Sequence, residues 1–415
     1  MRKCALGLSI FLIFTIPWEK MVTTSGQVNT IARLSGLVAA AVWAGSIIVT
    51  GRVRKPHPLH IAILLYILWN VLTLFWTVDV DLTTGRLETY FQLLAMMVMI
   101  WDLYTSAENH SAGLQAYVLG AYVTILGTIA NFMIHPNSYY LRYGATGFNV
   151  NQIGVIAALG IPAAWYLNLR EGSSDKWPAM RILNYLYVPA AVLATLLSGS
   201  RAGLFAILPG LFFIVWSFRR LSLLRKMAAF VFLASVLLVL PSLAPRTVFE
   251  RLAATRNSFG SLNLASRAEI YAAGIDLFLE HPVLGAGSGA FRPAAQESQS
   301  PHSSFLALLA EQGIIGFGIF SVVMVMAILY GRRQPQLLAR LWLAILFIWI
   351  IHSSVHEFLH LKQPWVFLSL VIVGAGLKEE RVRSAVGISR SASHMRPGHH
   401  SYARQILPGP DSSRS

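Results

Sequence analysis

The stretch SFLALLAEQGIIGFGIFSVVMVMAILY, residues 304–330, decides the fold class of this chain. It is apolar over more than the ~20 residues that a helix needs to cross the hydrocarbon core of a bilayer. The rest of the chain agrees with it, because 55% of all residues are hydrophobic and only 12% are charged. A typical soluble domain has about 25% charged residues. The sequence therefore predicts a protein that spans a membrane.

Similar apolar windows recur along the chain and predict an all-α, polytopic membrane protein with about 12 transmembrane helices. We expect helices because a segment inside a bilayer must satisfy its own backbone hydrogen bonds. The basic and apolar start of the chain also fits a cleaved signal peptide, but no small-residue cleavage site follows closely, which favours a retained first span. The predicted spans are residues 4–18, 28–50, 59–77, 82–103, 113–134, 152–169, 184–198, 203–217, 226–241, 304–330, 337–353 and 363–377.

The distribution of lysine and arginine predicts the orientation of the chain. Basic residues gather in the short loops between the second and third, sixth and seventh, eighth and ninth, and tenth and eleventh predicted spans. All of these loops lie on one side, and the positive-inside rule places them, with both termini, in the cytoplasm. The same pattern accounts for the net charge of +15 without a nucleic-acid partner. The residues concerned are Arg52, Arg54, Lys55, Arg170, Lys176, Arg181, Arg219, Arg220, Arg225, Lys226, Arg332, Arg333 and Arg340.

Residues 1–377 are predicted to form one multi-span membrane domain, with a long outer loop at 242–303 that contains short helices. From residue 378 to 415 the chain is basic and rich in Ser, His and Pro, which predicts a disordered cytoplasmic tail. The single cysteine, Cys4, rules out an intrachain disulfide and a metal site built of cysteines.

Arginines on the outer side run against this charge bias and are the first candidate binding residues. Arg201 lies in the short segment SGSRAG (198–203), between two predicted spans. A charge there is unfavourable unless it meets an anion or a carboxylate. The alternative is a side chain that extends along apolar surface to reach the interface. Arg142, in the outer segment 135–151, lies on the same side.

Arg267 belongs to the outer segment SRAEIYAAGIDLFLEHP, residues 266–282. Ser266 and Glu269 form a capping-box pattern, which predicts that a helix begins at Ser266 and that Arg267 lies in its first turn. The free backbone N–H groups of a first turn attract anions, so an arginine at this place fits a phosphate ligand. The alternative is a structural ion pair, for instance with Glu269 or Glu250.

His302 is the candidate acid–base residue. It follows Pro301 and precedes Ser303 and Ser304, either of which can cap the next predicted span. A helix N-terminus disfavours the imidazolium form, and a neutral imidazole can accept a proton near pH 7. The alternative is a histidine that is merely hydrogen-bonded at the membrane interface.

The stretch HEFLH, residues 356–360, supports a rival function. On one helix its two histidines would share a face and bind zinc, with Glu357 as the base of a membrane metalloprotease and His352 as a third ligand. Against this, the stretch lies where a span ends, and the next span, 363–377, carries no ionisable residue to serve as an acidic ligand. An interfacial histidine cluster is the favoured interpretation.

A polysaccharide or lipid transporter, such as a flippase, is the second alternative. Such proteins carry ionisable residues near the centres of their spans and paired repeats in their two halves. Neither pattern is found: most ionisable residues lie at span ends, as do Arg86 and Glu88 near the outer end of the fourth span.

Four stretches together resemble the O-antigen ligase and Wzy-type polymerase superfamily, which includes exopolysaccharide polymerases. They are LRYGATGFNVNQIGVIAAL (141–159), LSGSRAGLFAILPG (197–210), SRAEIYAAGIDLFLEHPVLGAGSGAF (266–291) and PHSSFLALLAEQGIIGFGIF (301–320). Each is weak alone, but their order and spacing also match, across roughly residues 140–330.

The resemblance implies a GT-C-like membrane glycosyltransferase that needs no metal ion or cofactor. It would move a glycan from undecaprenyl pyrophosphate to an acceptor hydroxyl at the periplasmic face of the bacterial inner membrane, with inversion. The acceptor would be another lipid-linked glycan in a polymerase, a sugar of the lipid A core in a ligase, or a protein hydroxyl. The implied partners are this donor, the acceptor, the bilayer and a chain-length regulator.

The resemblance also assigns roles to single residues. Arg201 and Arg267 match arginines that bind the donor pyrophosphate, with Arg142 as a third candidate, and His302 matches the histidine that activates the acceptor. Asn151 is a candidate supporting residue.

Two further candidate supporting residues follow the same resemblance. Ser303 stands where the family usually has an asparagine, and Glu357 resembles a glutamate of exopolysaccharide-type members.

Overall fold

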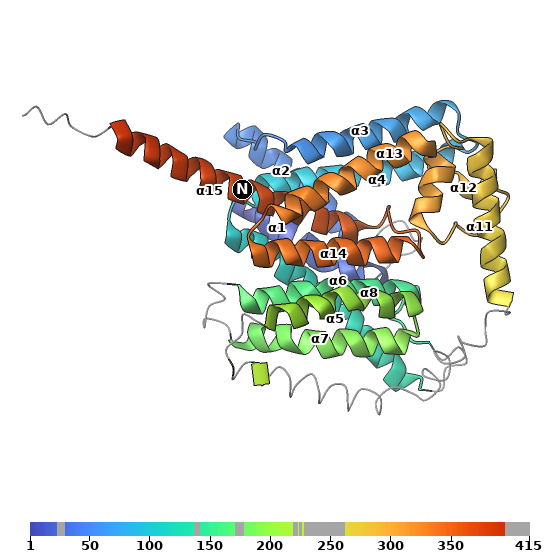
Figure 1. The fold of residues 1–415 in the computed structure, drawn as a ribbon, viewed down its shortest axis with the longest axis horizontal. Coiled ribbons are helices and arrows are strands. Elements are labelled where there is room, and N and C mark those ends of the chain that lie inside the picture. The colour runs from blue at the N-terminus through green and yellow to red at the C-terminus, as the bar shows by residue number, and fades with distance from the viewer. Residues whose placement is uncertain are drawn as a thin grey trace, which may run out of the picture. The chain divides into compact units, whose positions relative to one another are not determined.

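The computed structural model describes residues 1–22, 30–136, 142–170, 178–218, 223, 226–227 and 262–394, with the side chains of 262–267 and 380–394 excepted. Residues Met1–Leu377 form one compact unit and Lys378–Ser415 a second. Helices and connecting loops make up the first unit (Figure 1).

Eight of the described helical segments are long and apolar enough to cross a membrane. The chain is therefore an all-α, multi-pass membrane protein, as the sequence predicts. The elements are α1 (Arg2–Thr15), η1 (Ile16–Met21), α2 (Ile31–Thr50), α3 (Pro58–Leu72), η2 (Thr73–Phe75), α4 (Val80–Leu103), α5 (Ala107–Ile134), α6 (Val150–Leu169), α7 (Pro178–Ser198), α8 (Arg201–Ser217), α11 (Leu262–Glu280), α12 (Phe291–Ala294), α13 (Ser304–Arg332), α14 (Gln336–Ser353) and α15 (Lys362–His394).

Every predicted span coincides with a helix except 226–241, which lies outside the described residues apart from its first two positions. Boundaries differ where polar residues extend a helix. For example, α5 begins at Ala107 and not at residue 113, because the Ser106 side chain caps it by accepting a hydrogen bond from the backbone of Asn109. Hydropathy alone misses the polar first turn of such a helix.

Helix α6 is central to the packing of the helices around it. It packs against α5, α7, α8 and α14, and most of its length is buried. Gly154 of α6 and Gly203 of α8 allow these two helices to approach closely: a Cβ atom on Gly154 would lie 2.5 Å from the Cα atom of Gly203. This contact fixes the first turn of α8 on α6.

Helix α13 is broken at Gly313, which has a φ of 62° and a ψ of −170°. The glycine-rich loop, residues 285–291, packs against the break. Its backbone N–H groups at Ala286 and Gly287 donate hydrogen bonds to the carbonyl oxygens of Ala310 (2.9 Å) and Glu311 (2.8 Å). The predicted single span 304–330 is therefore two helical pieces joined at a break that another part of the chain completes.

Helix α11 begins at Leu262, four residues before the predicted start at Ser266. The capping-box prediction is therefore wrong, and Arg267 lies in the second turn. The preceding residues include Leu264 and Ala265, which favour a helix, so the helix extends past the serine. The helix packs against α13 through Ile270 and Leu277, which are buried.

Candidate functional site

Arg142 joins the segment before α6 to the turn before α8. Its Nε atom donates a hydrogen bond to the carbonyl oxygen of Ser198 (3.0 Å), and its Nη2 atom donates one to Oδ1 of Asn151 (2.8 Å). Two predicted site residues, Arg142 and Asn151, are thus in direct contact, and together they hold the turn that leads to Arg201.

Arg201 is the first residue of α8 and its side chain is exposed. Ser200 caps the helix by accepting a hydrogen bond from the backbone of Gly203 at 3.2 Å. The Arg201 side chain makes no hydrogen bond or ion pair with any residue that the structure describes. The N-terminus of a helix carries partial positive charge and does not stabilise a cation such as Arg201. An anion arriving here would interact favourably with both the guanidinium group and the helix dipole.

Arg267 is placed by its backbone alone, in the second turn of α11. Its side chain and the whole of Glu250 lie outside the described residues, as does the predicted ion pair between them.

His302 lies at the entrance to α13 and is tied to α11. The hydroxyl group of Tyr271, from α11, donates a hydrogen bond to the carbonyl oxygen of His302 (3.1 Å). The His302 Nε2 atom lies 3.1 Å from Oε1 of Gln299. Ser303 is the N-cap of α13, and its Oγ atom accepts a hydrogen bond from the backbone of Leu306 (3.4 Å). The predicted role of Ser303 as a cap fits this contact, and His302 precedes the cap directly.

Residues 354–361, here named the His356 loop, connect α14 to α15 and are not helical. The two histidines of HEFLH therefore do not share a helix face, which removes the geometry on which the metalloprotease interpretation rests. In the described part of the chain, no three His, Cys, Asp or Glu side chains gather in a metal-binding arrangement.

The His356 loop instead approaches His302. The rings of His302 and His356 have centroids 6.2 Å apart and are nearly perpendicular, at 89°. The His356 ring also lies 4.9 Å from that of His352, at the end of α14. Ser304 secures this contact, because its Oγ atom donates a hydrogen bond to the carbonyl oxygen of His356 (2.8 Å) and accepts one from the backbone of Phe358 (2.9 Å).

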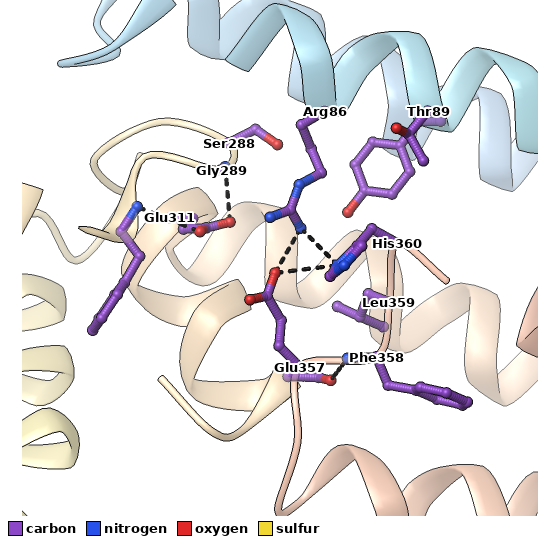
Figure 2. A network of polar contacts seen from close by, with 12 residues as sticks. Arg86, Thr89, Ser288, Gly289, Glu311, Glu357, Phe358, Leu359 and His360 are labelled. Atoms are coloured by element: carbon purple, nitrogen blue, oxygen red, sulfur yellow. Dashed lines mark hydrogen bonds and ion pairs between the residues drawn. The ribbon is translucent and has the colours of Figure 1, made fainter. Parts of the chain in front are cut away.

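Glu357 forms an ion pair with Arg86 of α4, with 2.8 Å between Arg86 Nη1 and Glu357 Oε1 (Figure 2). His360 Nδ1 lies 3.3 Å from the same carboxylate oxygen. Burial by itself would raise the pKa of Glu357, but the positive charge of Arg86, with His360 close beside the carboxylate, holds that pKa well below its usual range. Glu357 is therefore an anion that anchors the His356 loop to α4.

Glu311 of α13 anchors the glycine-rich loop in a similar way. Its carboxylate accepts hydrogen bonds from the backbone of Gly289 (2.9 Å) and of Phe291 (3.4 Å). The sequence did not single out Glu311 or assign a role to Arg86, and it gave His356 and His360 a role only as zinc ligands of the metalloprotease alternative. The available signal was an arginine and a glutamate within otherwise apolar helices, a combination that usually marks a buried pair or a functional site.

An apolar groove of about 750 Å³ runs between α8 and α14. Phe205, one turn after Arg201, and Ile351, next to His352, line one end, so both helices bring candidate site residues to the same end of the groove. At the other end Arg340 stacks on Trp216, with Cζ 2.8 Å from the ring centroid. The lining residues are Phe205, Leu208, Pro209, Phe212, Phe213, Trp216, Arg340, Leu343, Ala344, Phe347 and Ile351.

Residues 186–321 match the family model described as O-antigen ligase. The matched region runs from within α7 to the middle of α13 and contains Arg201, Arg267, His302 and Ser303. No curated protein matches the chain. The match supports the resemblance that the four sequence stretches predict. The chain is accordingly a multi-pass membrane protein whose residues 186–321 are similar to the O-antigen ligase family.

Proposed function

We propose that this protein is a membrane glycosyltransferase that moves a glycan from undecaprenyl pyrophosphate to an acceptor hydroxyl. The observation that carries the proposal is Arg201, an exposed arginine of the matched O-antigen ligase region at the N-terminus of α8, one turn before Phe205, which lines the apolar groove. A cation near an apolar groove matches a lipid pyrophosphate, which has an anionic group next to an apolar chain.

The proposed reaction breaks the bond between C1 of the donor sugar and the pyrophosphate oxygen. Negative charge grows on that oxygen as the bond breaks, and permanently charged guanidinium groups can stabilise it without a metal ion. Arg201 and Arg267 contact the pyrophosphate in this proposal. Arg142, held by Asn151, fixes the turn that carries Arg201 and adds positive charge beside it.

His302 is the proposed general base. It takes the proton of the acceptor hydroxyl while the oxygen attacks C1 from the side opposite the pyrophosphate, so the configuration at C1 is inverted. A positioned base of this kind typically contributes ~10²–10⁴-fold to the rate. Ser303 caps α13 behind the histidine, and Glu357 supports the loop beside it.

The groove between α8 and α14 would receive the first isoprene units of the donor. From Phe205 to Trp216 helix α8 extends for about 16 Å, at about 1.5 Å per residue. This covers only the part of the polyprenyl chain next to the pyrophosphate, and the remainder would lie in the bilayer.

The proposal also includes the topology of the chain and the location of the site in the membrane. Both termini lie in the cytoplasm, and the active site lies at the periplasmic face of the inner membrane, beside a long loop at 242–303. Residues 1–377 form the membrane domain and 378–415 a cytoplasmic tail. The acceptor, a second lipid-linked glycan or a lipid A core sugar, separates a polymerase, which would work with a chain-length regulator, from a ligase.

The test is the surface-glycan profile of a strain that lacks the protein, analysed by gel and mass spectrometry. The strain is complemented with wild type, Arg201→Ala, His302→Ala or the control Arg33→Ala, an arginine of α2 with no proposed role, at matched membrane levels. We expect wild type and Arg33→Ala to restore the glycan and the other two variants to fail. Accumulated single repeats would identify a polymerase, and unattached chains a ligase. An unchanged profile on deletion, or full restoration by Arg201→Ala and His302→Ala, would overturn the proposal.

A further inference from the structure

The segment that contains His302 lies between two loops, and both have a carboxylate as their anchor. Before it in sequence comes the glycine-rich loop, whose backbone at Gly289 and Phe291 donates hydrogen bonds to Glu311. After it comes the His356 loop, which carries Glu357. The first loop packs on the break in α13, and the second packs its His356 ring against that of His302.

One buried arginine lies between these two carboxylates. Figure 2 shows the guanidinium group of Arg86 between the side chains of Glu311 and Glu357. The side chain of Arg86 is 17% exposed and that of Glu357 is 9% exposed, so water screens this ion pair only slightly. Arg86 also lies beside the glycine-rich loop, since a Cβ atom added to Gly289 would lie 3.5 Å from its Nε atom.

The contacts continue from Arg86 to His302. Arg86 holds Glu357, and the backbone on either side of Glu357 is bonded to Ser304 of α13. Ser304 lies two residues after His302, and the ring of His356 lies nearly perpendicular to the His302 ring, with the centroids 6.2 Å apart. Loss of Arg86 would leave Glu357 without its cation in a largely buried place, and the His356 loop would lose its anchor to α4.

We propose that Arg86 is a positioning residue for glycosyl transfer: through its ion pair with Glu357 and its positive charge beside Glu311, it holds the two loops that set the orientation of His302. This inference rests on the proposed function, because it concerns the base of that reaction. It assigns a role to a residue outside the matched O-antigen ligase region, on a helix distant in sequence.

The proposal predicts that loss of Arg86 affects kcat and the KM for the donor differently. The donor pyrophosphate is bound by arginines on α8 and α11 and near α6, whereas Arg86 acts on the histidine that faces the acceptor. A displaced base lowers the rate of the chemical step, and a misplacement of about 1 Å can cost ~10²-fold. Loss of Arg86 should therefore lower kcat while the KM for the donor stays unchanged.

The experiment measures transfer by the full chain in lipid nanodiscs, with an undecaprenyl-pyrophosphate-linked repeat as donor. The same repeat, lipid-linked, and a lipid A core oligosaccharide are tried as acceptors. The variants are Arg86→Gln, Arg86→Lys, His302→Ala and the double variant Arg86→Gln/His302→Ala. The matched control is Arg33→Gln/Glu88→Gln, because Glu88 lies two positions after Arg86 on α4 but forms only an exposed, 3.7 Å pair with Arg33.

We expect Arg86→Gln to lower kcat by ~10- to 10²-fold with the donor KM within about twofold of wild type. Arg86→Lys, which keeps the charge, should retain more activity, and the control should equal wild type. In the His302→Ala background Arg86→Gln should cause no further loss, because a positioning residue has no effect once the residue it positions is absent.

Three results would overturn the proposal: an unchanged kcat in Arg86→Gln, a fall in kcat accompanied by an equal rise in donor KM, or a full additional loss in the His302→Ala background. If Arg86→Gln does not fold, Arg86→Lys must show the selective fall in kcat. A wild-type protein without transfer activity overturns the proposed function and this inference with it, whereas an active wild type with a fully active Arg86→Gln overturns only the inference.

Discussion

At the scale of single residues, the two described arginines near the start of α8 have different surroundings. Arg142 is engaged by Ser198 and Asn151, whereas Arg201 is exposed at a helix N-terminus. Sequence motifs identified both as candidates but could not distinguish them, because hydrogen-bond partners depend on tertiary contacts. For the same reason the partner of Glu357 was not predicted, since Arg86 comes from a helix far away in the chain.

The ion pair between Arg86 and Glu357 leads to a prediction about pH. The pKa of Glu357 in the folded protein is below the value of about 4.3 expected in the unfolded chain. The pair therefore contributes stability that is fully present above about pH 4.3 and is lost as the pH falls through the folded-state pKa. Glu357→Gln should be less stable than wild type by on the order of 3 kcal/mol at pH 7, since it leaves a buried cation without its partner.

The measurement is thermal unfolding in detergent at several pH values. The difference between wild type and Glu357→Gln should stay constant from pH 7 to about pH 5 and shrink below about pH 4. Asp81→Asn, which replaces an exposed carboxylate of the same helix as Arg86, is the control and should show no such difference. A stability gap that is equal at pH 7 and pH 3.5 would contradict the assignment of Glu357 as a buried anion.

At the scale of elements, the HEFLH stretch shows how a helical spacing can be misread. Its histidines have the i, i+4 spacing of a zinc site, yet the backbone on both sides of Glu357 is bonded to the Ser304 side chain. These hydrogen bonds, together with the ion pair between Arg86 and Glu357, hold the segment in a non-helical conformation. Local sequence carries no information about them, so the loop could not be predicted.

The break in α13 gives a second prediction. Gly313 has a positive φ, and a Cβ atom there would lie 2.2 Å from the carbonyl oxygen of Val283. Gly313→Ala should therefore lose stability through both backbone strain, about 1–3 kcal/mol, and displacement of the glycine-rich loop. Gly318→Ala is the matched control in the same helix, because nothing lies within 4 Å of its Cβ position.

Thermal stability and folded yield in membranes measure the difference between these two variants. Gly318→Ala should equal or slightly exceed wild type, since alanine favours a helix over glycine by about 1 kcal/mol. A Gly313→Ala protein as stable as Gly318→Ala would show that the helix is continuous at this point.

At the scale of the whole molecule, hydropathy predicted the fold class and nearly all of the spans. It could not predict which helices touch, because residues that face lipid and residues that face other helices are equally apolar. The central place of α6 depends on small residues such as Gly154 and Gly203, which only the packing reveals. The groove between α8 and α14 was likewise invisible in the sequence.

The groove gives a third prediction. Leu343→Trp would fill it with a larger side chain and should raise the KM for a long-chain polyprenyl donor by roughly 10-fold, the equivalent of about 1.4 kcal/mol of lost binding. The KM for a donor with a short prenyl chain should change less. Val325→Trp, on the exposed side of α13, is the control and should leave both values unchanged. Equal effects on long and short donors would exclude the groove as the place of the lipid chain.

The position of the His356 loop in the chain also determines when the site can work. During synthesis α4, the turn before α8 and the glycine-rich loop are made before His302, but residues 354–361 follow it only after two further helices, α13 and α14. A nascent chain that has already inserted α13 still lacks the partner of Arg86 and the ring that packs on His302. The centre is therefore completed only after α14 has been made, so a truncated or stalled chain holds Arg201 of α8, the proposed donor-binding residue, without a properly placed His302.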